Sequence, residues 1–376
     1  MNKSPRVYCG DRMVGKLALT ATNKAAFEYD DGWLEEGFSI SPFSLPLKKQ
    51  VYVPVKHHFY GLFGIFADSL PDAWGNLLMD RMLQKKGIDL GQINILDRLA
   101  MVGNSGLGAL TYQPEYEFGQ NFSDLDLDYL ANECKKILET KYSEELDRLY
   151  RLGGTSGGAR PKIMTKIDGE EWIIKFPAHV DGKDAGKMEF DYSVCAKACG
   201  IAMTDTKLFS SKECAGYFGT KRFDRSDKTD GSGRIHMATA AALLELDFRQ
   251  PNMDYHDLMK LTKILTRDSK TDLENMFRRA CFNVFAHNRD DHSKNFTFLY
   301  DERTDIWKLS PAYDLTYSRT YYGEHTTTVD GNGRNPSAKE LIQVGITAGI
   351  SKKKCIDIIE EIKECVEHML GEYIYE

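Results

Sequence analysis

The segment from Asp290 to Asn295 is the feature that most restricts what this chain can fold into. It places five polar or ionisable residues within six positions: Asp290, Asp291, His292, Lys294 and Asn295. Apolar segments flank it, with a helical pattern before it at residues 282–286 and a strand-like pattern after it at residues 296–298. We therefore expect these side chains where a helix ends and a strand begins. A solvated turn is the alternative, but rigid flanking elements favour a functional site.

The spacing of two aspartates and an asparagine in this region indicates phosphate chemistry. Asp290 lies five residues before Asn295, and a further acid, Asp314, follows a second short strand-like segment. In protein kinases an Asp accepts the proton of the substrate hydroxyl, an Asn five residues later binds Mg²⁺, and a later Asp holds the same metal cluster. Mg²⁺ prefers oxygen ligands and keeps several waters, so two protein ligands and the nucleotide phosphates suffice. The pattern predicts a Mg²⁺-dependent phosphoryl-transfer centre.

A lysine within an otherwise apolar strand predicts a second contact with phosphate. Lys175 follows Trp172, Ile173 and Ile174 directly. A strand lysine that pairs the α- and β-phosphates of ATP would explain it, with Glu189 on the next helix as the acid that orients it. The alternative is an edge-strand lysine that faces water.

A glycine-rich segment precedes this strand, with glycines at Gly153, Gly154, Gly157 and Gly158. Glycines permit positive φ and let backbone N–H groups approach a phosphate closely. The segment fits neither standard pattern, because Ala159 stands where a Walker A loop needs its lysine and no G-x-G-x-x-G is present. It is read as a nucleotide-binding loop, or otherwise as a flexible one, before a β-hairpin that turns at Asp168 and Gly169.

The remaining periodicity predicts an α+β chain. Residues 6–60 read as a small β-rich module, followed by a helix with Asp68 or Ser69 as N-cap. Further helices are expected over residues 188–199, 236–246, 272–287 and 351–370, with strands over 296–299 and 306–309. The expected division is an N-terminal subdomain (1–111), a connection (112–129), a region with the glycine-rich loop and the ATP lysine (130–245), and a helical C-terminal lobe (246–376).

Length and charge restrict the class of protein. At 376 residues the chain exceeds what one hydrophobic core usually serves, so we expect two cores or one core in two lobes. The formal net charge of -7 argues against a protein that binds duplex DNA over a wide face without a basic partner. Its eight cysteines are scattered without a C-x-x-C pattern, which indicates reduced core residues of a cytosolic protein. The first residues lack a signal-peptide pattern and no stretch has the length of a membrane span, so a cytoplasmic protein is expected.

Several ordered segments together resemble the HipA family of toxin kinases. Gly61–Gly75 looks like its N-terminal signature, and Gly157–Lys162 resembles its glycine-rich loop. The other segments that resemble the family are Ile174–Pro177 for the ATP lysine strand, Lys221–Arg225 for the adenine-side hinge, Asn288–Asn295 for the catalytic loop, and Pro311–Asp314 for the metal-binding segment. The resemblance covers most of the chain and implies a two-lobed, protein-kinase-like fold with an added β-rich N-terminal subdomain.

The resemblance also implies roles for single residues. Asp290 would be the catalytic base, Asn295 and Asp314 would hold Mg²⁺, and Lys175 would bind the phosphates of ATP. Family members are regulated by autophosphorylation in the glycine-rich loop, where Thr155 and Ser156 are the corresponding hydroxyls here, and the choice between them stays open. The acid often found at the start of the hinge is Lys221 in this chain, which leaves adenine contacts to the main chain and Phe223.

The implied partners follow from the same resemblance. They are a small DNA-binding, HipB-like antitoxin, through which alone DNA would be contacted, and a protein substrate from translation such as an aminoacyl-tRNA synthetase. The chain is short at its C-terminal end beside the longer family members, so surfaces from that helical region would be reduced.

Two other functions fit parts of the pattern. In a metal-dependent phosphohydrolase, Asp290, Asp291 and His292 would bind metal for water activation, but a second His/Asp cluster at suitable spacing is missing from the sequence. A pseudokinase would bind nucleotide without transferring phosphate, although every expected catalytic residue type is present.

Overall fold

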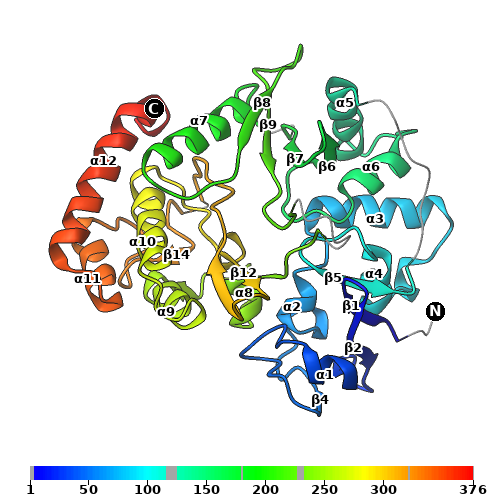
Figure 1. Cartoon of the computed structure of the whole chain (residues 1–376). Helices are drawn as coiled ribbons and strands as arrows, with labels where there is room; N and C mark the ends of the chain where they lie inside the picture. The colour runs from blue at the N-terminus through cyan, green and yellow to red at the C-terminus, as the bar shows by residue number, and fades with distance from the viewer. Residues whose placement is uncertain (1–3, 116–124, 179–180, 227–232, 321, 376) are drawn as a thin grey trace. The chain divides into compact units, whose positions relative to one another are not determined.

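The computed structural model describes residues 4–115, 125–178, 181–226, 233–320 and 322–375, and the chain in it divides into two compact units (Figure 1). The first unit comprises Met1–Gly186, Lys207–Ala238 and Ala242–Glu245. The second comprises Lys187–Thr206, Thr239–Ala241 and Leu246–Glu376. The four-part division given by the sequence patterns stays a prediction.

A five-stranded antiparallel sheet lies in the first unit. Its strands are β1 (Arg6–Cys9), β2 (Arg12–Leu19), β3 (Ala25–Tyr29), β4 (Val51–Tyr52) and β5 (Leu110–Gln113), in the order β4-β3-β2-β1-β5. Alternate residues are buried, among them Phe27 and Tyr29 of β3, as expected for a strand with one face on a core. The short helices of this region are α1 (Asp31–Glu36), η1 (His58–Gly61) and α2 (Gly64–Ala67). The β-rich module predicted for residues 6–60 is confirmed.

A second sheet forms the main core of the first unit together with the helices packed on it. The strands β6 (Lys162–Ile167), β7 (Glu170–Lys175), β8 (Thr206–Phe209) and β9 (Tyr217–Lys221) lie in the order β6-β7-β9-β8. The helices of this region are α3 (Ala73–Lys85), η2 (Leu90–Gln92), α4 (Ile95–Val102), α5 (Leu127–Leu138) and α6 (Leu146–Gly153). Trp74 and Leu78 of α3 belong to the same buried cluster as Ile163 of β6 and Ile174 of β7. Segments far apart in the sequence therefore share one core.

The predicted hairpin is present. Strands β6 and β7 are antiparallel, with Lys162 opposite Lys175 and Ile163 opposite Ile174. The turn residues Asp168 and Gly169 have φ of 52° and 86°. Two consecutive residues with positive φ give the turn twist that suits a tight hairpin.

Helix α3 begins later than the sequence pattern predicted. The prediction of Asp68 or Ser69 as its N-cap is wrong, because Asp72 occupies that position. The Asp72 carboxylate makes no capping hydrogen bond to the helix and instead accepts one from the backbone nitrogen of Gly158 at 2.7 Å. The Ser69 hydroxyl interacts with the hydroxyl of Tyr112 at 2.7 Å. Long-range partners, absent from local sequence, decide both positions.

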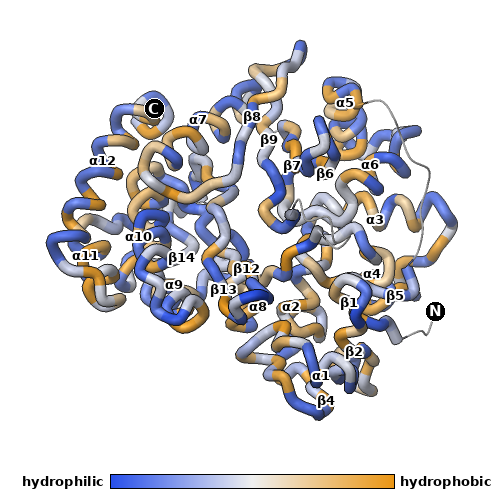
Figure 2. Tube along the Cα trace, viewed as in Figure 1, coloured by the Kyte–Doolittle hydropathy of each residue, from blue (hydrophilic) through white to orange (hydrophobic). Residues whose placement is uncertain are grey.

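Four helices pack on one another in the second unit: α9 (Tyr255–Leu265), α10 (Lys270–Phe285), α11 (Ala338–Ala348) and α12 (Lys352–Ile374). Helix α7 (Ala185–Ala198) enters this unit at Lys187. Hydrophobic residues recur at helical intervals along α12, which Figure 2 shows, and its buried residues include Ile358, Ile362 and Val366. The helices predicted over residues 188–199, 272–287 and 351–370 are confirmed. Among the helices that the structure describes, none is long and apolar enough to cross a membrane.

The second unit also contains short strands on either side of the polar segment. Strand β12 (Thr297–Asp301) pairs antiparallel with β13 (Ile306–Leu309), as predicted, and η3 (Ser293–Asn295) lies directly before β12. Strand β11 (Met253–Asp254) pairs in parallel with β14 (Thr327–Thr328). The polar residues thus lie between a helix, α10, and a strand, β12. The α+β class is confirmed, with a β-rich N-terminal part and a mainly helical C-terminal part.

The helix predicted over residues 236–246 is wrong at both ends. Met237–Thr239 forms strand β10, and only Ala240–Leu243 forms helix α8. The alanines have high helix propensity, but propensity yields to tertiary contacts. The backbone nitrogen of Ala240 donates to the backbone oxygen of Phe296 at 2.7 Å, a contact that no local pattern indicates.

Candidate active site

The glycine-rich loop lies in the first unit between α6 and β6 and is folded inward. Thr155 and Ser156 are only 4% and 1% exposed. The Thr155 hydroxyl donates to the backbone oxygen of Ser105 at 3.0 Å, and the Ser156 hydroxyl donates to that of Gly153 at 2.6 Å. Both candidate autophosphorylation hydroxyls are therefore buried and hydrogen-bonded in this conformation.

Packing accounts for two of the four glycines that were predicted to approach ATP. A Cβ on Gly153 would lie 2.2 Å from a backbone oxygen of β6, and one on Gly154 would lie 2.4 Å from a backbone oxygen of α6. Gly158 has φ of 86°, a conformation that other residues adopt only with strain. At Gly157 a Cβ would approach other atoms no closer than 3.3 Å. Gly153 and Gly154 are thus required by the fold, whether or not nucleotide binds.

Two charged side chains hold this loop, and the sequence analysis gave neither of them that role. The Asp72 carboxylate accepts from the backbone nitrogen of Gly158, and the ammonium of Lys162 donates to the backbone oxygen of Gly157 at 2.6 Å. Lys162 is 6% exposed. A buried cation requires such a partner, so a lysine at the start of a predicted core strand was the available signal.

Lys175 is the last residue of β7 and is half-buried. Its ammonium nitrogen lies 5.7 Å from the centroid of the Phe218 ring. An aromatic face attracts a cation through its negative quadrupole. Glu189, expected to orient Lys175, is buried on α7 in the second unit, and their pairing stays a prediction.

The adenine-side segment follows strand β9. The ammonium of Lys221 forms an ion pair with Glu170 at 2.6 Å, and Phe223 is half-buried two residues later. Their contacts with adenine stay a prediction. Arg222, which lies between these two residues, forms a buried ion pair at 2.8 Å with Asp224, which follows Phe223.

Asp224 anchors this segment to the loop before β5. Its carboxylate accepts from the backbone nitrogen of Gly108 at 2.7 Å and from Arg225 at 2.7 Å. Burial by itself raises the pKa of Asp224, but Arg222 and Arg225 outweigh it and bring this pKa down to about 2. The adenine-side segment is therefore fixed by a charge network, which the sequence resemblance did not reveal.

The predicted catalytic loop follows α10 in the second unit. The side-chain amide nitrogen of Asn295 donates to the backbone oxygen of Asp290 at 2.8 Å. This hydrogen bond closes the loop and leaves the amide oxygen of Asn295 as the atom that can bind a metal. The side chain of Asp290 is 60% exposed, with one carboxylate oxygen 3.9 Å from a ring nitrogen of His292. The structure thus joins two of the predicted site residues and leaves the Asp290 carboxylate exposed.

The third predicted residue of this centre, Asp314, follows β13. Its φ of 54° lies in the left-handed region, which a residue other than glycine occupies only at a cost and often at functional sites. The hydroxyl of the preceding residue, Tyr313, donates to the backbone oxygen of Lys294 at 2.5 Å. The metal-binding segment predicted from the sequence is therefore bonded to the catalytic loop next to Asn295.

Asp291, to which the sequence gave no role, is the buried anchor of the catalytic loop. Its side chain is fully buried and accepts from the Tyr255 hydroxyl at 2.9 Å and the Thr327 backbone nitrogen at 3.0 Å. The ring nitrogen Nδ1 of His325 lies 3.0 Å from the same carboxylate. Burial and the charge of Asp291 raise the pKa of Tyr255 well above its usual value, so its hydroxyl stays a donor. The two adjacent aspartates therefore differ in their surroundings: the Asp290 side chain is exposed, whereas the Asp291 side chain is buried and holds the loop in place.

Further hydrogen bonds connect the same loop to its surroundings. The side-chain amide of Asn288 donates to Asn283 of α10 at 2.9 Å, and the backbone nitrogen of Thr326 donates to the backbone oxygen of Arg289 at 3.0 Å. The His292 ring packs on Phe248, with 5.4 Å between centroids. The loop is therefore fixed by side-chain and backbone contacts to several elements of its own unit.

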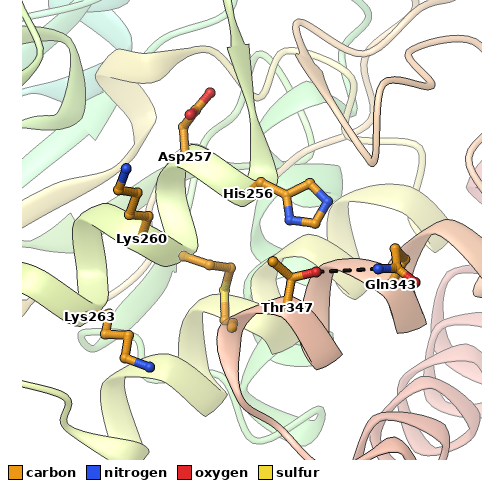
Figure 3. A pocket seen from close by; sticks show the side chains of 8 residues that line it. His256, Asp257, Lys260, Lys263, Gln343 and Thr347 are labelled. Carbon is orange, nitrogen blue, oxygen red and sulfur yellow. Dashed lines mark hydrogen bonds between the residues drawn. The ribbon is translucent and has the colours of Figure 1, made fainter.

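A cavity of about 480 Å³ opens between α9 and α11 in the second unit (Figure 3). Its polar lining includes His256, Lys260 and Lys263 from α9, with Gln343 and Thr347 from α11. The ring of His256 is paired with Asp330 at 3.1 Å. None of the predicted phosphoryl-transfer residues lines this cavity, so its size does not make it the site of that chemistry.

Two family models match the sequence. The HipA-like C-terminal domain matches residues 154–370, which is more than half of the chain, and the HipA N-terminal domain matches residues 6–113. The chain belongs to the HipA family. The C-terminal match of this HipA family chain includes both the strand that ends at Lys175 and the predicted catalytic loop.

Curated relatives match over nearly the whole length. They include two proteins of Sinorhizobium fredii (strain NBRC 101917 / NGR234). "Putative kinase Y4dM" is 27% identical and covers 96% of this chain and 90% of the relative. "Putative kinase Y4mE" is 22% identical and covers 97% of this chain and 91% of the relative.

A solved structure matches the fold. It is the complex of the Shewanella oneidensis MR-1 toxin–antitoxin system HipA, HipB and its operator DNA, in which the matched chain superposes with a TM-score of 0.73 at 19% identity. The match covers 99% of this chain and 91% of that chain. The HipA-like, protein-kinase-like fold expected from the sequence resemblance is confirmed.

Proposed function

We propose that this HipA family chain is an ATP- and Mg²⁺-dependent serine/threonine protein kinase that acts as the toxin of a type II toxin–antitoxin module. The observation that carries the proposal is the catalytic loop, in which Asn295 is bonded to Asp290 while the carboxylate of Asp290 stays open. The relatives named as kinases support the activity, and the Shewanella toxin–antitoxin complex supports the biological role.

In this mechanism Asp290 is the general base. Its exposed carboxylate accepts the proton of a serine or threonine hydroxyl as the hydroxyl oxygen bonds to the γ-phosphorus of ATP and ADP leaves. The bond from Asn295 and the buried neighbour Asp291 keep the loop rigid, so little reorganisation is needed at the moment of transfer. A positioned base of this kind contributes about 10²–10⁴-fold in rate.

The oxygen donors of Asn295 and Asp314 fit Mg²⁺. The amide nitrogen of Asn295 donates a hydrogen bond within the loop, so the amide oxygen is the atom that would bind the ion. Asp314 would supply a carboxylate oxygen. Both are the hard oxygen ligands that Mg²⁺ prefers. When bound, the ion would neutralise charge on the phosphates during transfer.

The first unit would supply the nucleotide contacts. Lys175 would donate to the α- and β-phosphates, and the backbone of Gly157 and Gly158 would cover the phosphates. Glu189, a residue of the second unit, is proposed to orient Lys175. Phe223 and the main chain after Lys221 would contact the adenine ring.

Autophosphorylation at Thr155 or Ser156 would require the loop to leave its buried conformation. Both hydroxyls are used in hydrogen bonds and neither is exposed to a phosphoryl donor. A phosphate carries nearly two negative charges and cannot return to a site that lacks matching donors. Modification would therefore hold the loop outside and block ATP, which gives the protein a means of switching itself off.

The proposed partners are a HipB-like antitoxin and a translation protein such as an aminoacyl-tRNA synthetase. The Shewanella relative is seen with HipB and operator DNA. The net charge of -7 on this chain suits a toxin whose basic antitoxin supplies the DNA affinity. The proposed location is the cytoplasm.

Incubation of the full chain with γ-labelled ATP and Mg²⁺ tests the proposal. We expect label on Thr155 or Ser156, located by mass spectrometry, and a loss of at least about 100-fold in Asp290→Asn. Asp357→Asn, an exposed aspartate of α12 outside the site, is the matched control and should label normally. Free phosphate without labelled protein would favour the phosphohydrolase, and nucleotide binding without either product would favour the pseudokinase. Both results would contradict the proposal.

A further inference from the structure

Three thiols gather in the second unit on facing positions of two helices. Cys195 and Cys199 of α7 and Cys365 of α12 have their sulfur atoms within 4.8 Å of one another. A fourth sulfur is close, since the thioether of Met369 lies 3.7 Å from the Cys365 sulfur. All eight cysteines of the chain are free thiols. Nothing in the phosphoryl-transfer mechanism uses this cluster.

The helical period explains how the four sulfurs meet. Cys195 and Cys199 are four residues apart on α7, and Cys365 and Met369 are four residues apart on α12. Residues at this spacing lie on the same face of a helix, one turn apart. Each helix therefore presents two sulfur atoms on one face, and the Cys365 sulfur of α12 lies within 4.8 Å of both thiols of α7.

Other contacts hold the two helices in this register. The hydroxyl of Tyr373 on α12 donates to Asp191 on α7 at 2.6 Å, and the ammonium of Lys187 on α7 donates to the Tyr373 hydroxyl at 3.2 Å. The rings of Tyr192 and Tyr373 lie 6.0 Å apart between centroids. These contacts are one to two turns from the thiols, so the sulfurs are brought together by the packing of the fold.

We propose that Cys195, Cys199 and Cys365 bind one soft metal ion, copper(I), with the thioether of Met369 as the fourth sulfur. Metal–thiolate bonds of about 2.3 Å place sulfur ligands about 3.8–4.0 Å apart in tetrahedral or trigonal sites. The three thiol sulfurs are already within 4.8 Å of one another. Side-chain rotations that move each sulfur by less than about 1 Å would bring them to these distances.

The donor set selects the ion. Among the described residues no histidine or carboxylate joins the three thiols in this group. Zinc sites are built from cysteine, histidine and carboxylate ligands. Thiolates combined with a thioether are soft ligands and favour copper(I).

The site has an entry path for an ion. Cys195 and Cys199 are buried, whereas Cys365 and Met369 are half-buried, so an ion would enter from the α12 side. Nearby, Arg278 donates to the backbone oxygen of Cys199 at 2.8 Å and so fixes the end of α7 beside the site. Binding through three thiolates releases their three protons to solvent and involves no electron transfer.

Copper(I) supplied as its bathocuproine disulfonate complex to the reduced full chain tests the proposal. We expect the protein to remove one equivalent of copper per chain, seen as loss of the absorbance of the complex. Cys365→Ser should weaken binding by at least about tenfold, since even indirect supports of metal sites have effects of that size. Met369→Leu, which removes only the thioether, should also weaken it. Bound copper should in addition protect Cys365 from alkylation.

Cys214→Ser is the matched control. Cys214 and Cys365 are the two cysteines of the chain that are not fully buried, and Cys214 lies outside the cluster. We expect Cys214→Ser to bind copper as the native chain does, and metal-free Cys365→Ser to keep the native circular dichroism spectrum. Copper binding that survives Cys365→Ser, no binding at all, or tighter binding of Zn²⁺ than of copper(I) would overturn the proposal. None of these outcomes depends on kinase activity, so this site and the proposed function fail or succeed separately.

Discussion

Replacing Asp291 should destabilise the second unit, whereas replacing its neighbour Asp290 should not. The Asp291 carboxylate is fully buried, and it holds donors from Tyr255 and Thr327 together with a ring nitrogen of His325. In Asp291→Ala these groups lose their acceptor without gaining water. Removing one partner from a buried charged network costs about 3–5 kcal/mol.

The comparison with Asp290→Ala makes this measurable. The Asp290 side chain is 60% exposed, and exposed substitutions usually change stability by less than about 0.5 kcal/mol. With a urea dependence of about 2–3 kcal/mol per molar, Asp291→Ala should lower the unfolding midpoint of the second unit by about 1–2 M. Asp291→Asn, which keeps one acceptor oxygen, should fall between. The trend would be followed by circular dichroism in urea. Equal midpoints for the two alanine variants would refute the assignment of Asp291 as an anchor.

Two further predictions concern the first unit. Gly158→Ala should lower the free energy of unfolding in urea more than Gly169→Ala, although both positions have φ of 86°. A Cβ at Gly158 would lie 2.5 Å from the ammonium of Lys162, whereas a Cβ at Gly169 would meet nothing within 4 Å. Equal losses would show that backbone strain alone determines the cost. Burial raises the pKa of Glu245 to about 7, so its carboxyl favours the neutral form in the folded state, and the stability this gives at pH 4.5 should be lost as the pH rises through 7. Urea unfolding at pH 5 and pH 8 measures that loss, and a Glu245→Gln variant with the same pH dependence would contradict it.

Local patterns predicted the elements whose residues carry their own signals. The hairpin around Asp168 and Gly169 follows from turn residues between alternating segments, and α10 and β12 follow from periodicity on either side of the polar loop. The spacing of Asp290 and Asn295 reflects a bond that the structure contains. Such features depend on residues a few positions apart.

Features that depend on distant partners were not predictable in this way. The N-cap of α3 was misplaced because Asp72 is bonded to Gly158, 86 residues later. Asp291 had no assignable role because its partners are 34 to 36 residues away in the chain. The thiol cluster joins Cys195 to Cys365, and no spacing in the sequence brings these two together.

The core shared by α3 and the β6–β7 hairpin makes the two family regions of the chain depend on each other. Trp74 and Leu78 belong to the region that matches the HipA N-terminal domain, while Ile163 and Ile174 belong to the region that matches the C-terminal domain. A gene that kept only the second region would expose apolar surface normally covered by α3, and the bond from Asp72 to the glycine-rich loop would be lost. Separating the two regions should therefore cost the first unit stability, because each covers apolar surface of the other.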